Sequence, residues 1–186
     1  AVKHWQSYHS SIITASSTNK NFINLNESAG TQTNGTATVW TSMGTDTFGV
    51  GTDSNSNGSG NNMIAYCFAE KTGFSKFGSY TGNGNADGTF VYTGFKPAFI
   101  LAKVTNAADN WTLWDNKRGS SNVVQSMLRA DATNAESNSS SYQVDLLSNG
   151  FKWRASDSKI NASSPYIYMA FAEAPLVGSN NIPCTA

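Results

Sequence analysis

The chain has 186 residues, with 12 basic side chains balanced by 12 acidic ones and only 13% charged residues in all. Binding to nucleic acid or to an anionic membrane surface demands an excess of positive charge, so the composition disfavours both. No run of 18 apolar residues is present, which argues against a membrane-spanning helix. Asn, Ser, Thr and Gly are abundant beside 12% aromatic residues. Such polar but uncharged surfaces are typical of extracellular proteins, virion proteins and carbohydrate binders.

The first half of the chain predicts short strands separated by polar loops. Apolar and aromatic residues form brief runs within stretches of Ser, Thr and Asn, as short half-buried strands require. The segment SNSNGSGNN at 54–62 has nothing to bury and predicts a loop. The expected strands are residues 1–8, 22–25, 37–43, 46–52 and 63–70.

The second half predicts a longer series of strands. A polar, glycine-rich connection spans 71–97 and holds one strand-like run at 89–92. Pro97 cannot donate to a sheet ladder, so it belongs at the start of the strand that follows. No window of helical length shows sustained 3.6-residue periodicity, and we predict an all-β fold, a sandwich or a jelly-roll-like arrangement. The remaining strands are expected at 98–104, 110–116, 123–129, 142–147, 150–155 and 166–173.

One of these runs occurs twice. MIAYCFAE at 63–70 matches YIYMAFAE at 166–173, 103 residues further on, with four of eight positions identical. We interpret the chain as two degenerate repeats of about 103 residues that form one compact β domain: an incomplete first repeat (1–70), a connection (71–97) and a second repeat (98–186). Two unrelated strands of similar composition are the alternative. Because Ala1 falls inside the repeat pattern, we expect a longer polypeptide upstream.

The sequence gives little support for a metal or cofactor. The only His and Cys residues, His4, His9, Cys67 and Cys184, lack zinc-type spacing. The segment 83–88 is rich in oxygen atoms but holds one carboxylate, so an Asp-Gly turn explains it better than calcium. Two cysteines are too few for a disulfide framework, a bridge between them is left open, and Cys67 is expected to be small and buried.

A catalytic constellation is equally hard to find. There is no Gly-x-Ser-x-Gly motif. Glu70 and Glu173 are equivalent in the two repeats, but each ends an apolar run. We therefore expect them to accept backbone hydrogen bonds or to pair with Lys or Arg. A glycan depolymerase would need two carboxylates from different strands in one cleft, about 5–10 Å apart. Nothing in the sequence selects such a pair.

The densest candidate for carbohydrate binding is WTLWDNKR, residues 111–118. Exposed aromatic rings stack on sugar faces, and neighbouring polar side chains bind hydroxyl groups. Trp111 and Trp114 face opposite sides of a strand, so one of them can be exposed, with Asp115 and Arg118 beside it. The alternative is that both tryptophans pack in the sheet and that Asp115 and Arg118 form a local salt bridge. Trp5, Trp40 and Trp153 are weaker candidates.

Four long segments resemble a domain of unknown function that is common in tailed-phage structural proteins, especially of marine phages. They are GSYTGNGNADGTFVYTGFKPAF (78–99), WTLWDNKR (111–118), LLSNGFKWR (146–154) and YIYMAFAEAPLVGSNNIP (166–183). The positions that match a recurring unit of that family are Gly94, Pro97, Ile100, Lys103, Trp111, Phe171 and Glu173. The resemblance implies an all-β virion protein, near the end of a tail-fibre-like chain, and brings no established catalytic or binding residues.

Three functions follow as hypotheses. The first is a non-enzymatic virion-surface module of a tailed phage, in a tail fibre, spike or capsid decoration, that contacts other virion proteins and copies of itself in a homo-oligomer and recognises the host surface. The second is a lectin-like carbohydrate-binding module for a host surface glycan. The third is a glycan depolymerase. For the first two we expect no cofactor, no nucleic acid and no membrane insertion.

Overall fold

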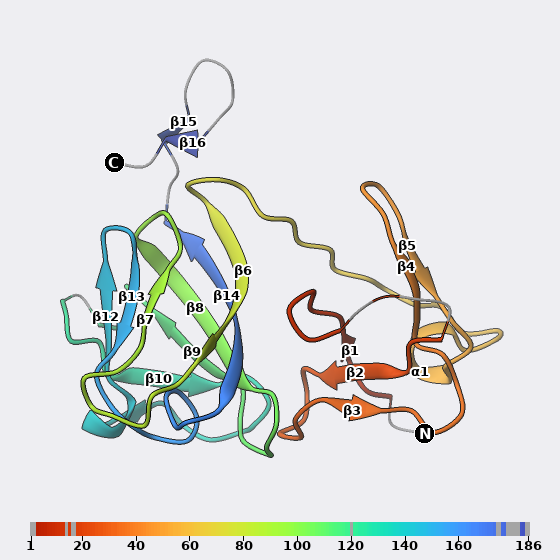
Figure 1. Cartoon of the computed structure of the whole chain (residues 1–186), viewed down its shortest axis with the longest axis horizontal. Coiled ribbons are helices and arrows are strands. Elements are labelled where there is room, and N and C mark those ends of the chain that lie inside the picture. The colour runs from red at the N-terminus through yellow and green to blue at the C-terminus, as the bar shows by residue number, and fades with distance from the viewer. Residues whose placement is uncertain are drawn as a thin grey trace.

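The computed structural model describes residues 3–13, 15, 18–119 and 121–173, together with the backbone of two short strands near the C-terminus. It comprises a β-sandwich (residues 71–172), a smaller N-terminal unit (residues 3–62) and an extended connecting segment (residues 63–70) that joins them (Figure 1). The strands of the sandwich are β6 (Ser75–Thr81), β7 (Phe90–Tyr92), β8 (Pro97–Val104), β9 (Thr112–Asp115), β10 (Ser126–Arg129), β11 (Ser137–Asn138), β12 (Val144–Leu147), β13 (Gly150–Trp153) and β14 (Pro165–Ala172), with the 3-10 helix η1 (Ser140–Tyr142) before β12.

Two antiparallel sheets form the sandwich. The larger has the strand order β11-β10-β9-β8-β14-β6 and the smaller has the order β12-β13-β7. Their facing side chains make one core, in which Tyr80 stacks on Tyr166 with ring centroids 4.9 Å apart and Trp114 meets Trp153 edge-on at 4.9 Å. The buried hydroxyl group of Tyr80 donates to Ile160 O at 2.7 Å, which removes the cost of burying it. The prediction of an all-β sandwich is confirmed.

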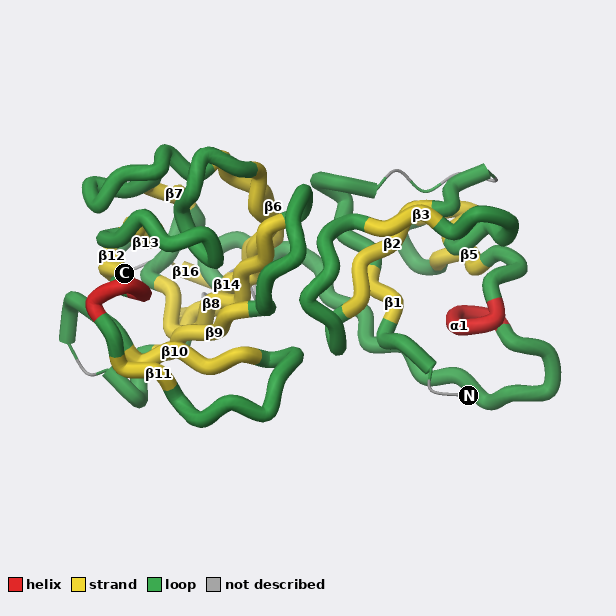
Figure 2. The backbone as a smooth tube through the Cα atoms, turned by 90° about the horizontal axis from the view of Figure 1, so that it is seen from below, coloured by secondary structure: helices red, strands yellow, loops and turns green. Residues whose placement is uncertain are grey.

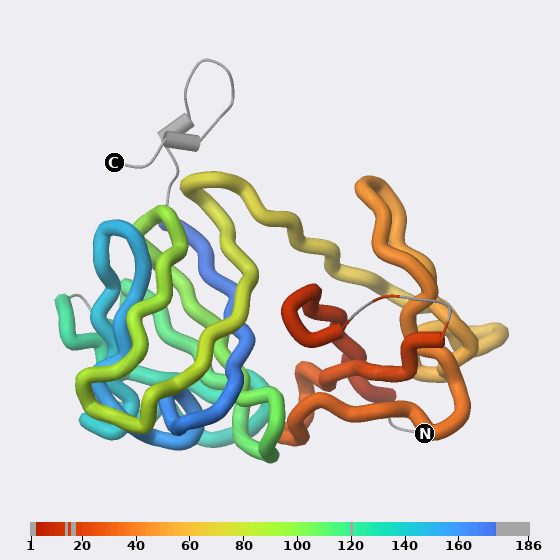
Figure 3. Tube along the Cα trace, viewed as in Figure 1, coloured from red at the N-terminus to blue at the C-terminus, as the bar shows by residue number. Residues whose placement is uncertain are grey.

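The N-terminal unit consists of small sheets. It has a three-stranded sheet of β1 (Gln6–Ser7), β2 (Asn21–Asn24) and β3 (Gln32–Thr33), a hairpin of β4 (Trp40–Met43) and β5 (Phe48–Val50), and the short helix α1 (Ser54–Asn57). Ile13, Val39 and Trp40 form its own small core. Figures 2 and 3 show the unit as a separate lobe beside the sandwich. The backbone of β15 (Leu176–Val177) and β16 (Pro183–Cys184) makes a further two-stranded pairing.

The N-terminal unit covers the outer face of the larger sheet. Ile23 of β2 packs with Leu101, Trp111 and Ile167 in a second buried cluster. Trp111 Nε1 donates to Asn24 O at 2.8 Å and Thr31 N donates to Thr105 O at 2.7 Å. A Cβ at Gly30 would lie 2.5 Å from Thr105 O, so this close approach requires glycine. The two lobes therefore share a buried interface as well as the connecting segment.

The connecting segment corrects one prediction. Residues 63–70 are exposed and form no strand, although the similar residues of β14 pair with a strand on each side, β8 and β6. Cys67, expected to be buried, is exposed and free for the same reason, and the side chain of Cys184 lies outside the described residues. The sequence repeat is thus not matched by a repeated strand.

The predicted connection at 71–97 is also wrong. Residues 75–81 form β6, which pairs with β14 from Ser75↔Phe171 to Thr81↔Pro165. Gly78 and five hydroxyl-bearing or basic residues give this segment the composition of a loop. Gly78 is needed because a Cβ there would lie 2.8 Å from the hydroxyl oxygen of Tyr168 on the neighbouring strand. Strands β3 and β11 were not predicted either. Within the described residues, no helix has the length and apolar character that a membrane span requires.

Lys103 on the outer face of β8 generates a first prediction. Its side chain is fully buried, Nζ donates to Val104 O at 2.8 Å and Ala107 O at 3.4 Å, and burial lowers its pKa to about 8 although Asp109 and Asp131 act to raise it. Between pH 8 and 10.5 the unfolded state then binds more protons at this lysine than the folded state does. The free energy of unfolding should therefore rise with pH in this window, by about 3 kcal/mol at most.

Urea unfolding at pH 7, 8, 9 and 9.5 measures this rise, and the variant Lys103→Met should lose it while keeping every other titrating group. Above pH 10 both proteins should lose stability, because burial raises the pKa of Tyr166 and of Tyr168 to about 12. Equal pH profiles for the two proteins below pH 10 would contradict the assignment to Lys103.

Candidate functional site

The structure does not expose the predicted glycan-stacking tryptophans. Trp111 retains 6% of its accessible surface and Trp114 retains none. Trp111 lies beneath the N-terminal unit, and Trp114 lies in the sandwich core with its Nε1 donating to Tyr142 O at 3.1 Å. A sugar ring cannot reach either indole face in this fold. The alternative interpretation, that both rings pack against the sheet, is the correct one.

Asp115 and Arg118 form the local salt bridge expected from that alternative. Arg118 Nε lies 2.6 Å from Asp115 Oδ2, and its Nη1 lies 3.1 Å from Glu136 Oε2. Burial alone would raise the pKa of Asp115, but hydrogen bonds from the backbone and the guanidinium of Arg118 outweigh it and hold that pKa below its ordinary value. These two residues close the turn after β9 and do not combine with either tryptophan into a binding site.

The equivalent glutamates have the structural roles predicted for them. Glu70 Oε2 pairs with Lys76 Nζ at 2.8 Å and its Oε1 accepts a hydrogen bond from Phe77 N at 3.2 Å. Glu173 pairs with Lys117 and accepts from Asn116 Nδ2 at 2.8 Å. They lie at separate positions and are not brought together as an acid pair.

The histidines are also engaged by neighbouring groups. His9 Nδ1 accepts from Ser11 N at 3.2 Å, so its Nε2 carries the proton toward Tyr168 O at 3.3 Å, and burial lowers the pKa of His9. His4 Nδ1 lies 2.8 Å from Glu27 Oε1. Within the part of the chain that the structure describes, no three His, Cys, Asp or Glu side chains gather as metal ligands.

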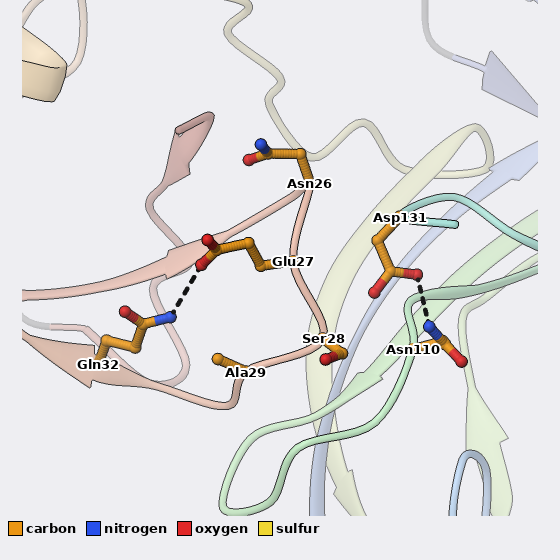
Figure 4. Close-up of a pocket in the computed structure, with 7 residues that line it drawn as sticks. All are labelled: Asn26, Glu27, Ser28, Ala29, Gln32, Asn110 and Asp131. Carbon is orange, nitrogen blue, oxygen red and sulfur yellow. Dashed lines mark hydrogen bonds between the residues drawn. The ribbon is translucent and has the colours of Figure 1, made fainter. Parts of the chain in front are cut away.

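A polar cleft lies where the two lobes meet. Its volume is about 640 Å³, and its walls come from the loop between β2 and β3 on one side and from residues before β9 and after β10 on the other (Figure 4). The lining residues are Asn26, Glu27, Ser28, Ala29, Gln32, Asn110 and Asp131. We call this the inter-lobe cleft. Six of its seven side chains offer hydrogen-bonding atoms.

Two carboxylates face this cleft from different elements. Glu27 Oε2 accepts from Asn24 Nδ2 at 2.8 Å and from Gln32 Nε2 at 3.4 Å, and the Asn24 bond is the main cause of the lowered pKa of Glu27. Asp131 Oδ1 accepts from Asn110 Nδ2 at 3.2 Å and Trp111 N at 3.1 Å. Asp131 Oδ2 is buried and has no hydrogen-bond partner in the protein, and in Figure 4 it points away from Asn110.

This geometry suits recognition of hydroxyl groups more than catalysis. The lining offers amide, hydroxyl and carboxylate groups, which can exchange hydrogen bonds with the hydroxyl groups of a ligand. A glycosidase also needs one carboxyl group held protonated near the working pH, whereas hydrogen bonding keeps Glu27 ionised. The backbone N–H of Trp5 donates to Asn26 Oδ1 at 2.9 Å, which fixes one of the lining side chains. Neither Glu27 nor Asp131 carries a sequence motif that would have revealed this pairing.

The connecting segment is a second candidate surface. Met63, Ile64, Tyr66 and Phe68 retain 47% to 67% of their accessible surface, and Trp5, 48% exposed, packs on Tyr66 in a tilted arrangement with ring centroids 5.9 Å apart. Single apolar side chains on a surface are ordinary, whereas neighbouring exposed ones such as these make the segment a candidate contact surface.

Comparison with protein families identifies the chain at the level of a family. A family model described as "Domain of unknown function (DUF7483)" matches residues 1–175. The chain belongs to this family. Neither the curated proteins nor the solved structures contain a significant match. Family membership assigns no activity.

The burial of the tryptophans gives a second prediction. Trp114→Ala should lower the free energy of unfolding by about 3–5 kcal/mol, because it leaves a large cavity in the sandwich core. Trp5→Ala, at an exposed position, should change it by less than about 1 kcal/mol. Urea denaturation followed by circular dichroism measures both. Similar small losses for the two variants would mean that Trp114 is not a core residue.

Proposed function

We propose that the chain is a non-enzymatic structural module on the surface of a tailed-phage particle, in a tail fibre, a spike or a capsid decoration, and that it assembles with copies of itself and with other virion proteins. The observation that carries the proposal is the exposed apolar connecting segment. The resemblance of residues 78–99, 111–118, 146–154 and 166–183 to a domain of phage structural proteins supports the location.

The physical case for assembly rests on the cost of exposed apolar surface. Ile64, Tyr66 and Phe68 each leave at least 61% of their surface in water. Burying such a side chain is worth about 1.5–3 kcal/mol. Burial of all three side chains against a partner would therefore contribute a favourable free energy of association. The balanced charge of the chain favours neither attraction nor repulsion between copies.

Assembly is tested by light scattering on the purified chain. We expect an oligomer whose mass falls to that of a monomer in the triple variant Ile64→Ser/Tyr66→Ser/Phe68→Ser. The double variant Phe90→Ser/Tyr92→Ser is the matched control, since both residues are exposed on β7 but lie outside the connecting segment. A monomeric parent chain at micromolar concentration, or equal dissociation in the control, would overturn the proposal.

A second function is supported by the inter-lobe cleft: recognition of a host surface glycan. The carboxylates of Glu27 and Asp131 and the amide and hydroxyl groups beside them are the kinds of group that bind sugar hydroxyls. In this proposal the site moves from the 111–118 segment to the boundary between the two lobes.

Binding to an array of bacterial surface polysaccharides, followed by calorimetry on a positive glycan, tests this second function. Asp131→Asn keeps the shape and the acceptor for Trp111 N but removes the charge, and should weaken binding about tenfold, or about 1.4 kcal/mol. Asp46→Asn, at an exposed position away from the cleft lining, should not. Equal affinities for the two variants would exclude the cleft, and release of reducing ends by the parent chain would replace binding with depolymerisation.

A further inference from the structure

The larger sheet of the sandwich has an open edge at β6. The strand order places β6 at one end of the sheet, with β14 as its only neighbour. Gly82 N donates to Ser164 O at 3.0 Å and Ala172 N donates to Phe74 O at 2.8 Å. The backbone N–H and C=O groups of the even-numbered residues of β6 therefore point toward β14. Because hydrogen-bonded pairs alternate along antiparallel strands, Ser75, Phe77 and Ser79 turn their backbone groups to the open side.

The connecting segment begins to pair with this edge and is then diverted. Lys71 and Ser75 exchange backbone hydrogen bonds of 3.1 Å and 2.9 Å across a turn. The next bond of that ladder would join Phe77 N to Ala69 O. Instead Glu70 Oε1 accepts from Phe77 N at 3.2 Å, and Ser75 Oγ donates to Ala69 O at 2.8 Å. Two side chains thus take the partners that a continued ladder would need.

The N-terminal unit holds the rest of the segment away from its own β6. Tyr66, in the middle of the segment, stacks on Trp5 of that unit. The unit is fixed to the sandwich by the Ile23 cluster and by the bond from Trp111 Nε1 to Asn24 O. Pairing of the segment with its own β6 would require Tyr66 to leave Trp5. A strand from another molecule would leave Tyr66 of the receiving chain on Trp5, and would replace the bonds that Lys71 and Glu70 make to Ser75 and to Phe77 N.

We propose that the connecting segment of a second copy of this chain adds to the open edge of β6 as a seventh, antiparallel strand. The inference rests on the proposed assembly function and specifies how the copies meet. Its basis is the sequence match: β14, which already pairs with β6, reads YIYMAFAE where the segment reads MIAYCFAE. The segment therefore has the residue pattern that β6 is known to accept on its other side.

The register of β14 predicts the register of the added strand. β14 places Ile167 opposite Ser79, Met169 opposite Phe77 and Ala170 opposite Lys76. Transferred by the sequence match, this puts Ile64 opposite Ser79, Tyr66 opposite Phe77 and Cys67 opposite Lys76. Ile64, Tyr66 and Phe68 then lie on the outer face of the sheet.

That face already holds aromatic side chains that would receive them. Phe77 and Phe99 contact Phe171 there, with ring centroids 5.8 Å and 6.1 Å away. Within a single chain, Phe68 already lies 6.2 Å from Phe77. Each chain carries one connecting segment and one β6 edge, so two copies can exchange segments reciprocally. Such a two-fold dimer is closed and leaves no unpaired β6 edge.

The free Cys67 provides the test. Lys76→Cys places a second sulfur opposite Cys67 at a non-hydrogen-bonded pair, where Cα atoms are about 4.5 Å apart and a disulfide can form. Under mild oxidation we expect more than half of the chain to run as a disulfide-linked dimer on a non-reducing gel. Ser79→Cys places its sulfur on the opposite face of the sheet from Cys67 and should give at least fivefold less dimer.

Two control variants define the linkage. Lys76→Ala removes the ion pair with Glu70 without adding a thiol, and it should give no disulfide-linked dimer. Lys76→Cys/Cys67→Ser removes the partner thiol and should also give no disulfide-linked dimer. A monomer with an internal disulfide between Cys67 and the cysteine introduced at position 76 would show that the segment pairs with β6 of its own chain. This result would overturn the exchange of segments between two copies. An oligomer by light scattering with no linkage would overturn strand addition but leave the assembly function standing. A monomer with no linkage would overturn both.

Discussion

Strand β8 is buried on both of its faces, and the rest of the molecule is arranged around that constraint. Ile100, Ala102 and Val104 point into the sandwich core, while Leu101 and Lys103 point to the opposite side. One small sheet can cover only the first set. The second set needs another layer, and the sheet of β1, β2 and β3 supplies it by placing Ile23 against Leu101 and Trp111. The N-terminal unit is therefore part of the fold of the sandwich and more than an attached domain.

Covering this face has a cost at Lys103. A lysine between two apolar layers is desolvated, which lowers its pKa, and it is tolerated because two backbone carbonyl groups accept from its Nζ. The same close contact leaves a polar border where the lobes separate. Asp131 fixes Trp111 N at this border with one carboxylate oxygen and leaves the other without a partner. The inter-lobe cleft thus lies at the border of the N-terminal sheet, where this sheet stops covering the outer face of the larger sheet.

Much of this architecture could be predicted from the sequence, and the failures have physical reasons. Strands with uninterrupted apolar runs, such as β8 and β14, were found within a residue or two because burial on both faces leaves a strong pattern. β6 was missed because Gly78 and its polar neighbours resemble a loop, although Gly78 is there to admit the ring of Tyr168. Composition alone also could not show that Trp111 is covered, since the residues that cover it lie almost ninety positions earlier in the chain.

The cleft could not be predicted for a related reason. Glu27 and Asp131 are ordinary acidic residues with no motif around them, and only the docking of the two lobes brings them to one cleft. A sequence pattern reports what each segment buries in its own strand, but it does not report which loops meet at the border of two layers.

The matching segments 63–70 and 166–173 show the limit of local sequence most directly. Both end in Phe-Ala-Glu, and both glutamates accept hydrogen bonds from amide groups and pair with lysine. The local chemistry is therefore reproduced, yet one segment is the central partner of β6 and β8 and the other is unpaired. The difference lies in what stands beside each segment. Strand propensity describes how well a segment fits a sheet surface, and it has an effect only where an edge is available. The edge at β6 lies close to a segment whose sequence matches β14, the strand on the other side of β6.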